Sequence, residues 1–213
     1  MIYIPRETSK AIHKEKRSRF IGLLYPVPTK ETVDSFLKHC RKEYPKAQHI
    51  CWAYRFYNNG NFYENSTDAG EPSGTAGRPI LNSLLKKNVS NCILTVVRIF
   101  GGIKLGKKGL TQAYGTCASL VLDNANLVQW TPETNVYVHS PIQFYGQLSS
   151  LFSSEDLEIQ KDLSHDTIRW LIKVKEEEFD TFQKKIYDVT AGEGKVSIEK
   201  KGRNSQPLEV LGG

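Results

Sequence analysis

A run of apolar residues near the middle of the chain, residues 93–100, constrains the fold more than any other feature. It is apolar on both faces, and Arg98 is its only charged residue. A strand of that kind needs cover on both sides, so the run predicts a central strand of a layered sheet or a strand at the centre of a domain. A membrane-spanning helix needs roughly 18 apolar residues in succession, and no uncharged apolar run in the sequence reaches that length.

Residues 1–134 mix helical and strand patterns, which predicts an α+β domain. Thr29 is suited to cap a helix and Pro45 to end it, and Asn58-Asn59-Gly60 favours a hairpin because Asn and Gly accept positive φ. Residues 63–77 are rich in turn formers and are expected to be irregular. The expected strands are 19–27, 49–57, 93–100 and 127–130, and the expected helices are 29–44, 79–87 and 109–125.

The pattern changes near Pro132, where a second domain is expected to begin. Beyond it, strands are predicted at 135–139, 157–163, 167–174 and 195–199, and helices at 141–153 and 176–188. This βαββαβ order is that of the ferredoxin-like fold. The expected organisation is a basic domain at 1–134, a ferredoxin-like domain at 135–203 and a flexible tail at 204–213.

The two predicted domains carry charge of opposite sign. Residues 1–134 hold 19 Lys and Arg against 10 Asp and Glu, whereas residues 135–213 hold 10 against 13, and the whole chain has a net charge of +6. No acidic residue lies between Glu71 and Asp123. A basic domain of this kind predicts a polyanionic partner such as nucleic acid. The alternative is a basic surface that binds nothing specific.

The chain has four cysteines and none at CxxC spacing. They are Cys40, Cys51, Cys92 and Cys117. A chain of this length and apolar content does not need a disulfide framework, so we expect reduced thiols in a cytoplasmic protein. His39-Cys40 and His49-x-Cys51 could supply zinc ligands, but Cys51 falls in a predicted strand, which favours core packing. We therefore expect no metal and no cofactor, and the N-terminus lacks the pattern of a signal peptide.

A glycine-rich segment at residues 68–79 leads into the predicted helix at 79–87. Its candidate residues are Asp68, Gly70, Glu71, Pro72, Ser73, Gly74, Thr75, Gly77 and Arg78. Backbone N–H groups at a helix start can hold an anion, and Arg78 would help. The alternatives are a structural turn held by Asp68, Ser73 and Thr75, or a carboxylate pair of Asp68 and Glu71, which lacks a third ligand nearby. The spacing matches neither a Walker A loop nor a dinucleotide fingerprint.

A second glycine-rich segment joins the strand at 93–100 to the helix at 109–125. Its candidate residues are Arg98, Gly101, Gly102, Lys104, Gly106, Lys107, Lys108 and Gly109. Gly-Lys-Lys-Gly is similar in mechanism to the loop that clamps nucleic-acid backbone in KH domains, because glycines admit a phosphate and lysines supply charge. The alternative is a solvated loop with two lysines that bind nothing.

Two arginines in predicted strands need a place for their charge. The sequence near Arg98 offers no acid, and an unpaired buried charge costs several kcal/mol. We therefore expect Arg98 to face solvent or a ligand, in one concavity with Arg78 and the lysines. Arg55 and Tyr57 share a strand face that could stack bases, although a plain amphipathic strand is the preferred interpretation. Local spacing assembles no Ser-His-Asp or Cys-His arrangement.

Together, the two glycine-rich segments resemble those of the IMPACT/YigZ family. The matching residues are Asp68 through Pro79 and Val97-Arg98-x-Phe100-Gly101-Gly102-Ile-Lys104-Leu-Gly106, followed by Gly109-Leu110 and Ala113-Tyr114-Gly115. The resemblance covers about residues 17–130, and residues 135–200 match the family's second domain by pattern. The chain departs from the family at Ile99, where an aromatic is usual, and at Lys107 and Lys108, where a small residue and a glycine are usual.

The resemblance implies an N-terminal α/β sandwich like domain IV of elongation factor G and a C-terminal ferredoxin-like domain like its domain V. It also implies a link to the control of translation, which the family's animal and fungal relatives exert through the kinase pathway that senses amino-acid starvation. The departure at Lys107 and Lys108 makes the loop stiffer and more basic, which argues against a family-wide small-ligand role for this loop and leaves a phosphate role intact.

The expected function is therefore that of a cytoplasmic RNA- or ribosome-associated protein that regulates translation. Its expected partner is RNA or the ribosome, with a protein of translation control as a further partner and no membrane. The alternative is an enzyme that acts on a small phosphorylated or peptidic substrate at residues 68–77. A protein-interaction module is a third possibility. Binding of RNA or the ribosome is preferred to both.

Overall fold

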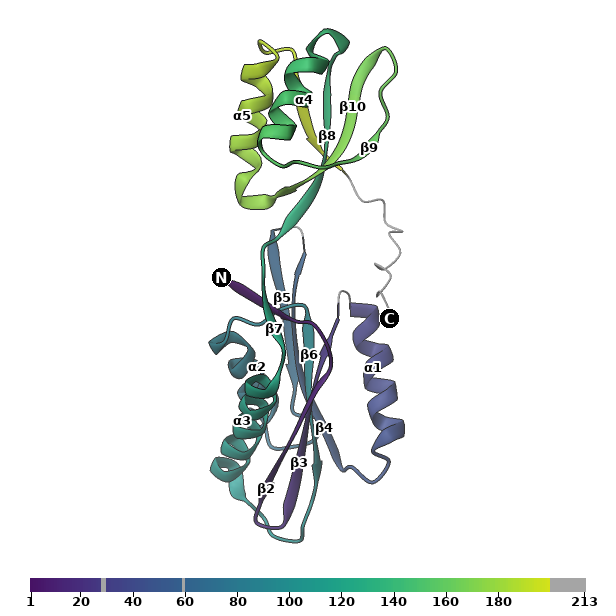
Figure 1. Ribbon diagram of the computed structural model, residues 1–213. Helices are drawn as coiled ribbons and strands as arrows, with labels where there is room; N and C mark the ends of the chain where they lie inside the picture. Colours follow the sequence, from purple (N-terminus) through teal and green to yellow (C-terminus); the bar gives the residue numbers. More distant parts are fainter. Residues whose placement is uncertain (28–29, 59, 200–213) are drawn as a thin grey trace. The chain divides into compact units, whose positions relative to one another are not determined.

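The computed structural model describes residues 1–27, 30–58 and 60–199. The expected helix cap Thr29 and the expected tail at 204–213 lie outside these residues. The chain divides into two compact units, Met1–Trp130 and Thr131–Gly213. Both units combine helices with β-sheet (Figure 1), as the sequence predicts.

Unit 1 is built on a five-stranded antiparallel sheet with the order β2-β3-β6-β4-β5. Its strands are β2 (Ser9–Glu15), β3 (Ser18–Pro26), β4 (His49–Asn58), β5 (Asn61–Thr67) and β6 (Cys92–Ile99). The predicted central position of the apolar run is confirmed, because β6 is the middle strand and is buried from Cys92 to Arg98.

Helices cover both faces of this sheet (Figure 1): α1 (Lys30–Glu43) packs on one face, and α2 (Gly77–Lys86) and α3 (Gly106–Asn124) pack on the other. The alternation along β4 follows from this arrangement. Tyr54 and Phe56 join the cluster under α1, whereas Cys51 and Ala53 join the cluster under α2 and α3. Two-sided cover is the reason why β6 carries no polar face.

The edges of unit 1 depart from the sequence prediction. Residues 63–67, expected to be irregular, belong to β5, an edge strand whose residues 61–65 are exposed and therefore need no apolar pattern. The helix expected from residue 109 begins at Gly106. The short strand β1 (Ile2–Pro5), which the sequence pattern did not predict, pairs with β7 (Leu127–Trp130).

Unit 2 has a four-stranded antiparallel sheet with the order β11-β8-β10-β9. Its elements are β8 (Glu133–Pro141), η1 (Ile142–Phe144), α4 (Tyr145–Ser154), β9 (Ile159–Asp162), β10 (Thr167–Lys175), η2 (Glu176–Glu178), α5 (Phe179–Val189) and β11 (Lys195–Ile198). The predicted βαββαβ order is observed. Phe152 of α4 and Phe182 of α5 pack with Trp170 of β10 in one core cluster, so both helices lie on the same face of the sheet.

Among the helices in the described part of the chain, none is both long enough and apolar enough to cross a membrane.

Candidate functional site

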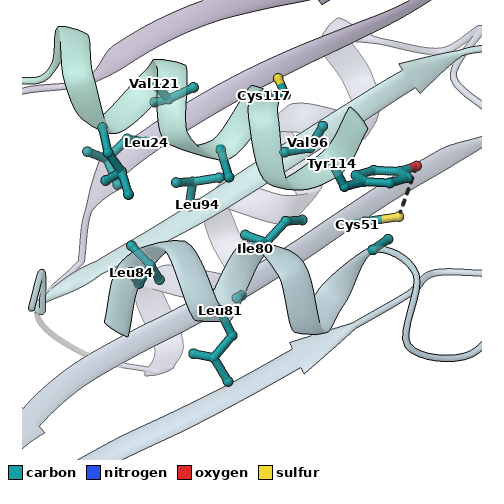
Figure 2. Close-up of a cluster of buried hydrophobic side chains, with 14 of the residues drawn as sticks. Leu24, Cys51, Ile80, Leu81, Leu84, Leu94, Val96, Tyr114, Cys117 and Val121 are labelled. Carbon is teal, nitrogen blue, oxygen red and sulfur yellow. Dashed lines mark hydrogen bonds between the residues drawn. The ribbon is translucent and has the colours of Figure 1, made fainter. Parts of the chain in front are cut away.

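The two glycine-rich segments meet at one end of unit 1. Helices α2 and α3 lie side by side and run in the same direction, with Leu84 and Val121 at one end and Tyr114 nearer the other (Figure 2). Residues 68–76 lead into the start of α2, and residues 100–105 lead from the end of β6 into the start of α3. Both helices therefore begin at the same end of the layer.

The carboxylate of Asp68 holds the start of α2. One of its oxygens accepts hydrogen bonds from the backbone N–H groups of Ala76 and Gly77, each at 2.9 Å, and the other accepts from Gly74 at 2.8 Å. Burial works to raise the pKa of this carboxyl, but the three N–H donors outweigh it and hold the pKa below its ordinary value. Asp68 is thus a helix cap, the structural role that the sequence left open beside anion binding.

Glu71 forms a buried ion pair with Arg98. A terminal nitrogen of Arg98 lies 2.7 Å from Oε1 of Glu71, and the same oxygen accepts a hydrogen bond from the hydroxyl of Tyr114 at 2.8 Å. Only 4% of the Glu71 side chain and 8% of the Arg98 side chain are exposed. The rings of Phe20 and Phe100 lie 5.7 Å and 5.3 Å from the guanidinium carbon and add cation–π attraction.

The expectation that Arg98 faces solvent or a ligand is therefore wrong. Its partner, Glu71, lies 27 residues earlier in the chain. The residues next to Arg98 in the sequence therefore do not reveal this partner. Glu71 reaches Arg98 because the segment that precedes α2 folds over the end of β6. A base-stacking role for Arg55 is wrong as well, since Arg55 is buried and bonded to Glu64 at 2.8 Å.

Cys51 and Tyr114 complete this buried cluster (Figure 2). The sulfur of Cys51 lies 3.0 Å from the carbonyl oxygen of Asp68 and 3.3 Å from the hydroxyl of Tyr114. Burial raises the pKa of the Cys51 thiol to about 12, and burial together with Cys51 and Glu71 raises the pKa of Tyr114. Both groups are therefore protonated at neutral pH, and the thiol has no thiolate character for nucleophilic chemistry.

Two glycines of the motif segments, Gly77 and Gly101, are required by close packing against the backbone. A Cβ on Gly77 would lie 2.7–2.9 Å from the backbone of Thr67, and a Cβ on Gly101 would lie 2.1 Å from the carbonyl oxygen of Arg17. No side chain fits at such distances without a backbone shift. These two motif residues are thus explained by the fold alone.

Four basic side chains stay exposed at this end of unit 1, and we call them the basic edge. They are Arg78, Lys104, Lys107 and Lys108. Arg78 stands in the first turn of α2, whereas Lys107 and Lys108 stand in the first turn of α3 and not in the loop where the sequence placed them. Neither first turn holds an acidic residue, and the residue that caps α3, Leu105, makes no side-chain hydrogen bond to the helix.

The remaining motif residues lie around the basic edge. Gly102, Gly106, Pro72, Ser73 and Gly74 are exposed, whereas Thr75 is buried and its hydroxyl donates to the carbonyl of Pro72 at 2.7 Å. Gly70 lies against the ring of His49, whose Nδ1 is 2.9 Å from the carbonyl oxygen of Ala69. Sequence reasoning missed His49 and Cys51 as partners of this segment. No pattern on strand β4 signals either contact.

A catalytic arrangement of Asp68 and Glu71 is not formed. Asp68 is engaged by three backbone donors and Glu71 by Arg98 and Tyr114, and neither carboxylate bonds to the other's partners. A cavity of about 320 Å³ between α1 and β4 touches the segment only at Ala69. Within the described ranges, no three His, Cys, Asp or Glu side chains gather as metal ligands would.

Comparisons with known proteins agree on one family. The family model described as the Impact N-terminal domain matches residues 16–122. The IMPACT family member YvyE of Bacillus subtilis is 29% identical over 181 residues, which cover 85% of this chain and 83% of that protein. The IMPACT family member in the pol 5' region of Thermus thermophilus is 32% identical over 159 residues, which cover 75% and 85% respectively.

One solved structure matches this chain over nearly the whole length of both. A crystal structure described as that of a hypothetical protein is 26% identical, with a TM-score of 0.64, and the match covers 94% of this chain and 98% of that one.

Proposed function

The chain belongs to the IMPACT family, and from that premise we propose that unit 1 binds RNA, free or within the ribosome, through the basic edge. One observation carries the proposal: both acids of the two motif segments are engaged by groups of the fold, whereas four cations at the ends of these segments are exposed. Asp68 caps α2 and Glu71 neutralises Arg98, whereas Arg78, Lys104, Lys107 and Lys108 are exposed.

The start of α3 supports this proposal in two ways. Its first backbone N–H groups have no intrahelical partner, because the first four donors of any α-helix lack one, and Leu105 supplies no side-chain cap. The helix dipole adds partial positive charge at the same end. A phosphate there would meet backbone donors, the dipole and the side chains of Lys107 and Lys108 together.

The finer expectations from the family resemblance belong to this proposal. We propose that unit 1 is an α/β sandwich like domain IV of elongation factor G, and that unit 2 is a ferredoxin-like domain like its domain V. The strand order β11-β8-β10-β9 supports the second assignment. A regulatory role in translation, in the cytoplasm and with a protein partner of translation control, rests on family membership.

An enzyme that uses residues 68–77 is the weaker candidate. It would need a free acid, base or nucleophile beside a pocket. In the described structure the Asp68 and Glu71 carboxylates are engaged and the Cys51 thiol is protonated. No specific observation favours a substrate at this position.

The test is a salt titration of RNA binding by fluorescence anisotropy. The double variant Lys107→Ala, Lys108→Ala is compared with the wild type and with Lys86→Ala, Lys87→Ala, which removes the same charge near the C-terminal end of α2. Each phosphate contact on a single strand contributes roughly −0.7 to the slope of log affinity against log salt. We expect the first variant to flatten the slope by about 1 to 1.5 and the control to leave it unchanged.

Equal slopes for the wild type and the Lys107, Lys108 variant would refute the basic edge as the binding site. Absence of binding by the wild type at low salt would refute RNA as the ligand. Substitutions of surface lysines change folding stability little. Both variants should therefore have the fold of the wild type, which circular dichroism checks.

A further inference from the structure

The sheet of unit 2 has a second candidate surface, which is independent of the basic edge. Helices α4 and α5 cover one face of this sheet, and strand register fixes which side chains lie on the other face. His139 of β8 pairs with Arg169 of β10 and with Lys195 of β11. Paired residues of an antiparallel sheet point to the same side, so one aromatic ring lies between two cations.

The same face continues along the strands. Tyr137 pairs with Leu171, which in turn pairs with Lys161 of β9, and Asn135 pairs with Lys173. We call this set the open face. It consists of Asn135, Tyr137, His139, Lys161, Arg169, Leu171, Lys173, Lys195 and Ser197. Leu171 is buried, Asn135, Tyr137 and His139 are half-buried, and the other five are exposed. The alternate residues of the same strands, such as Val138 and Trp170, are buried under the helices.

The charge of the open face is opposite to that of its domain. Residues 135–213 carry more acids than bases, yet four of the nine residues of the open face are basic. The next pair along the same strands, Glu133 with Lys175, adds one charge of each sign. All four cations, Lys161, Arg169, Lys173 and Lys195, are exposed. Two carboxylates reach the set at one end: Glu133, 3.7 Å from Lys173, and Glu199, which accepts from the Tyr137 hydroxyl at 3.2 Å and from Asn135 at 2.9 Å.

The two rings are held in place and lie near the middle of the sheet. The guanidinium of Arg169 stands over the Tyr137 ring at 5.0 Å, and the Tyr137 and His139 rings are 6.1 Å apart. Burial and the nearby Arg169 charge lower the pKa of His139. Its ring is therefore neutral at pH 7 and offers a flat, uncharged surface between cations.

We propose that the open face of unit 2 binds single-stranded RNA, with bases stacked on Tyr137 and His139 and phosphates paired with Arg169, Lys173, Lys195 and Lys161. In other RNA-binding domains, aromatic side chains on a four-stranded sheet stack unpaired bases. Unpaired bases can stack in this way because their faces are exposed. Duplex RNA hides its base faces and gains nothing from the rings. The surrounding cations supply the attraction for the backbone.

The experiment measures the affinity of the full chain for a labelled oligouridine and for duplex RNA of equal length. It is done in the wild type and in the Lys107→Ala, Lys108→Ala background, so that binding by unit 1 is separated from binding by unit 2. Tyr137→Ala is expected to weaken single-strand binding about 5- to 150-fold, the range for loss of one stacked base, and to leave duplex binding unchanged. Tyr137→Phe keeps the ring and should bind as the wild type does.

Two controls and a second variant keep the test decisive. Tyr187→Ala and Lys184→Ala remove an exposed ring and an exposed charge from α5, away from the open face, and should change nothing. Arg169→Ala, at an exposed position, tests the face even if Tyr137→Ala fails to fold, and should flatten the salt slope for oligouridine by about 0.7. Unchanged single-strand affinity in folded Tyr137→Ala and Arg169→Ala, or equal losses for single strand and duplex in Tyr137→Ala, would overturn the proposal.

Discussion

Replacing Arg98 with methionine tests the buried ion pair that organises the two motif segments. The substitution keeps an unbranched apolar stem but removes the charge. It leaves the Glu71 carboxylate, whose side chain is 4% exposed, with Tyr114 as its remaining hydrogen-bond donor among the contacts described above. Removing one partner of a buried pair costs about 3–5 kcal/mol, since the other charge stays desolvated without compensation.

The matched control is Lys87→Met. Lys87 also pairs with an acid, Asp123, but the two side chains are 37% and 56% exposed. Exposed pairs contribute about 0–1 kcal/mol. The same kind of substitution at the two positions should therefore differ by at least about 2 kcal/mol.

A second substitution tests whether the unpaired charge of Glu71 causes the loss of stability. Glu71→Gln added to Arg98→Met removes the unpaired charge, while the amide oxygen still accepts from Tyr114. The double variant should be more stable than Arg98→Met alone, with a coupling of about 1–3 kcal/mol.

Hydrogen exchange followed by mass spectrometry measures these differences unit by unit. Exchange of the β4 and β6 amides reports the opening free energy of unit 1, and exchange of the β8 and β10 amides serves as an internal control that should not change. The reasoning is refuted if Arg98→Met costs no more than Lys87→Met, or if the double variant is less stable than the single one.

Two further predictions concern the motif segments. Asp68→Ala should destabilise unit 1 by about 0.5–2 kcal/mol, the range for a lost helix cap. The folded pKa of Asp68 is lowered, so its contribution is present above the unfolded pKa of about 3.9 and is lost as pH falls through the folded pKa; urea unfolding at pH 7 and at pH 3 should show the gap between variant and wild type closing at the acid end. Gly101→Ala should cost about 1–3 kcal/mol or more, because its Cβ would overlap the Arg17 carbonyl. Gly146→Ala, in open space on α4, should cost nothing, and thermal unfolding of the two glycine variants measures the difference.

The arrangement of the core could be predicted because its signal is periodic and local. The apolar run at 93–100 predicted that both faces of its strand are covered. In the structure, α1 covers one face of β6, and α2 and α3 cover the other. The βαββαβ order of the second half followed from alternating patterns along short segments. Edge elements such as β5 could not be predicted in this way, because an exposed strand carries no apolar face.

The candidate site, too, has a part that the sequence predicts and a part that it does not. Both segments and their exposed cations are visible in the sequence, since glycines and lysines mark them. The Glu71–Arg98 pair is not, because it depends on a 27-residue separation that only the folded chain closes. The position of Lys107 and Lys108 in the first turn of α3, where a loop was expected, could not be predicted for another reason. Gly106 begins α3 with φ at +69°, and a glycine ahead of two lysines is more typical of a loop than of a first turn.

Contact between RNA and the basic edge of unit 1 can be observed directly. Photocrosslinking of the wild-type chain to 4-thiouridine RNA, followed by mass spectrometry of the attached peptides, tests it most directly. Contact at this edge predicts crosslinks within residues 72–80 and 100–110, lost in the Lys107→Ala, Lys108→Ala variant and kept in Lys86→Ala, Lys87→Ala. Crosslinks confined to residues outside these two ranges, or the same pattern in both variants, would contradict it.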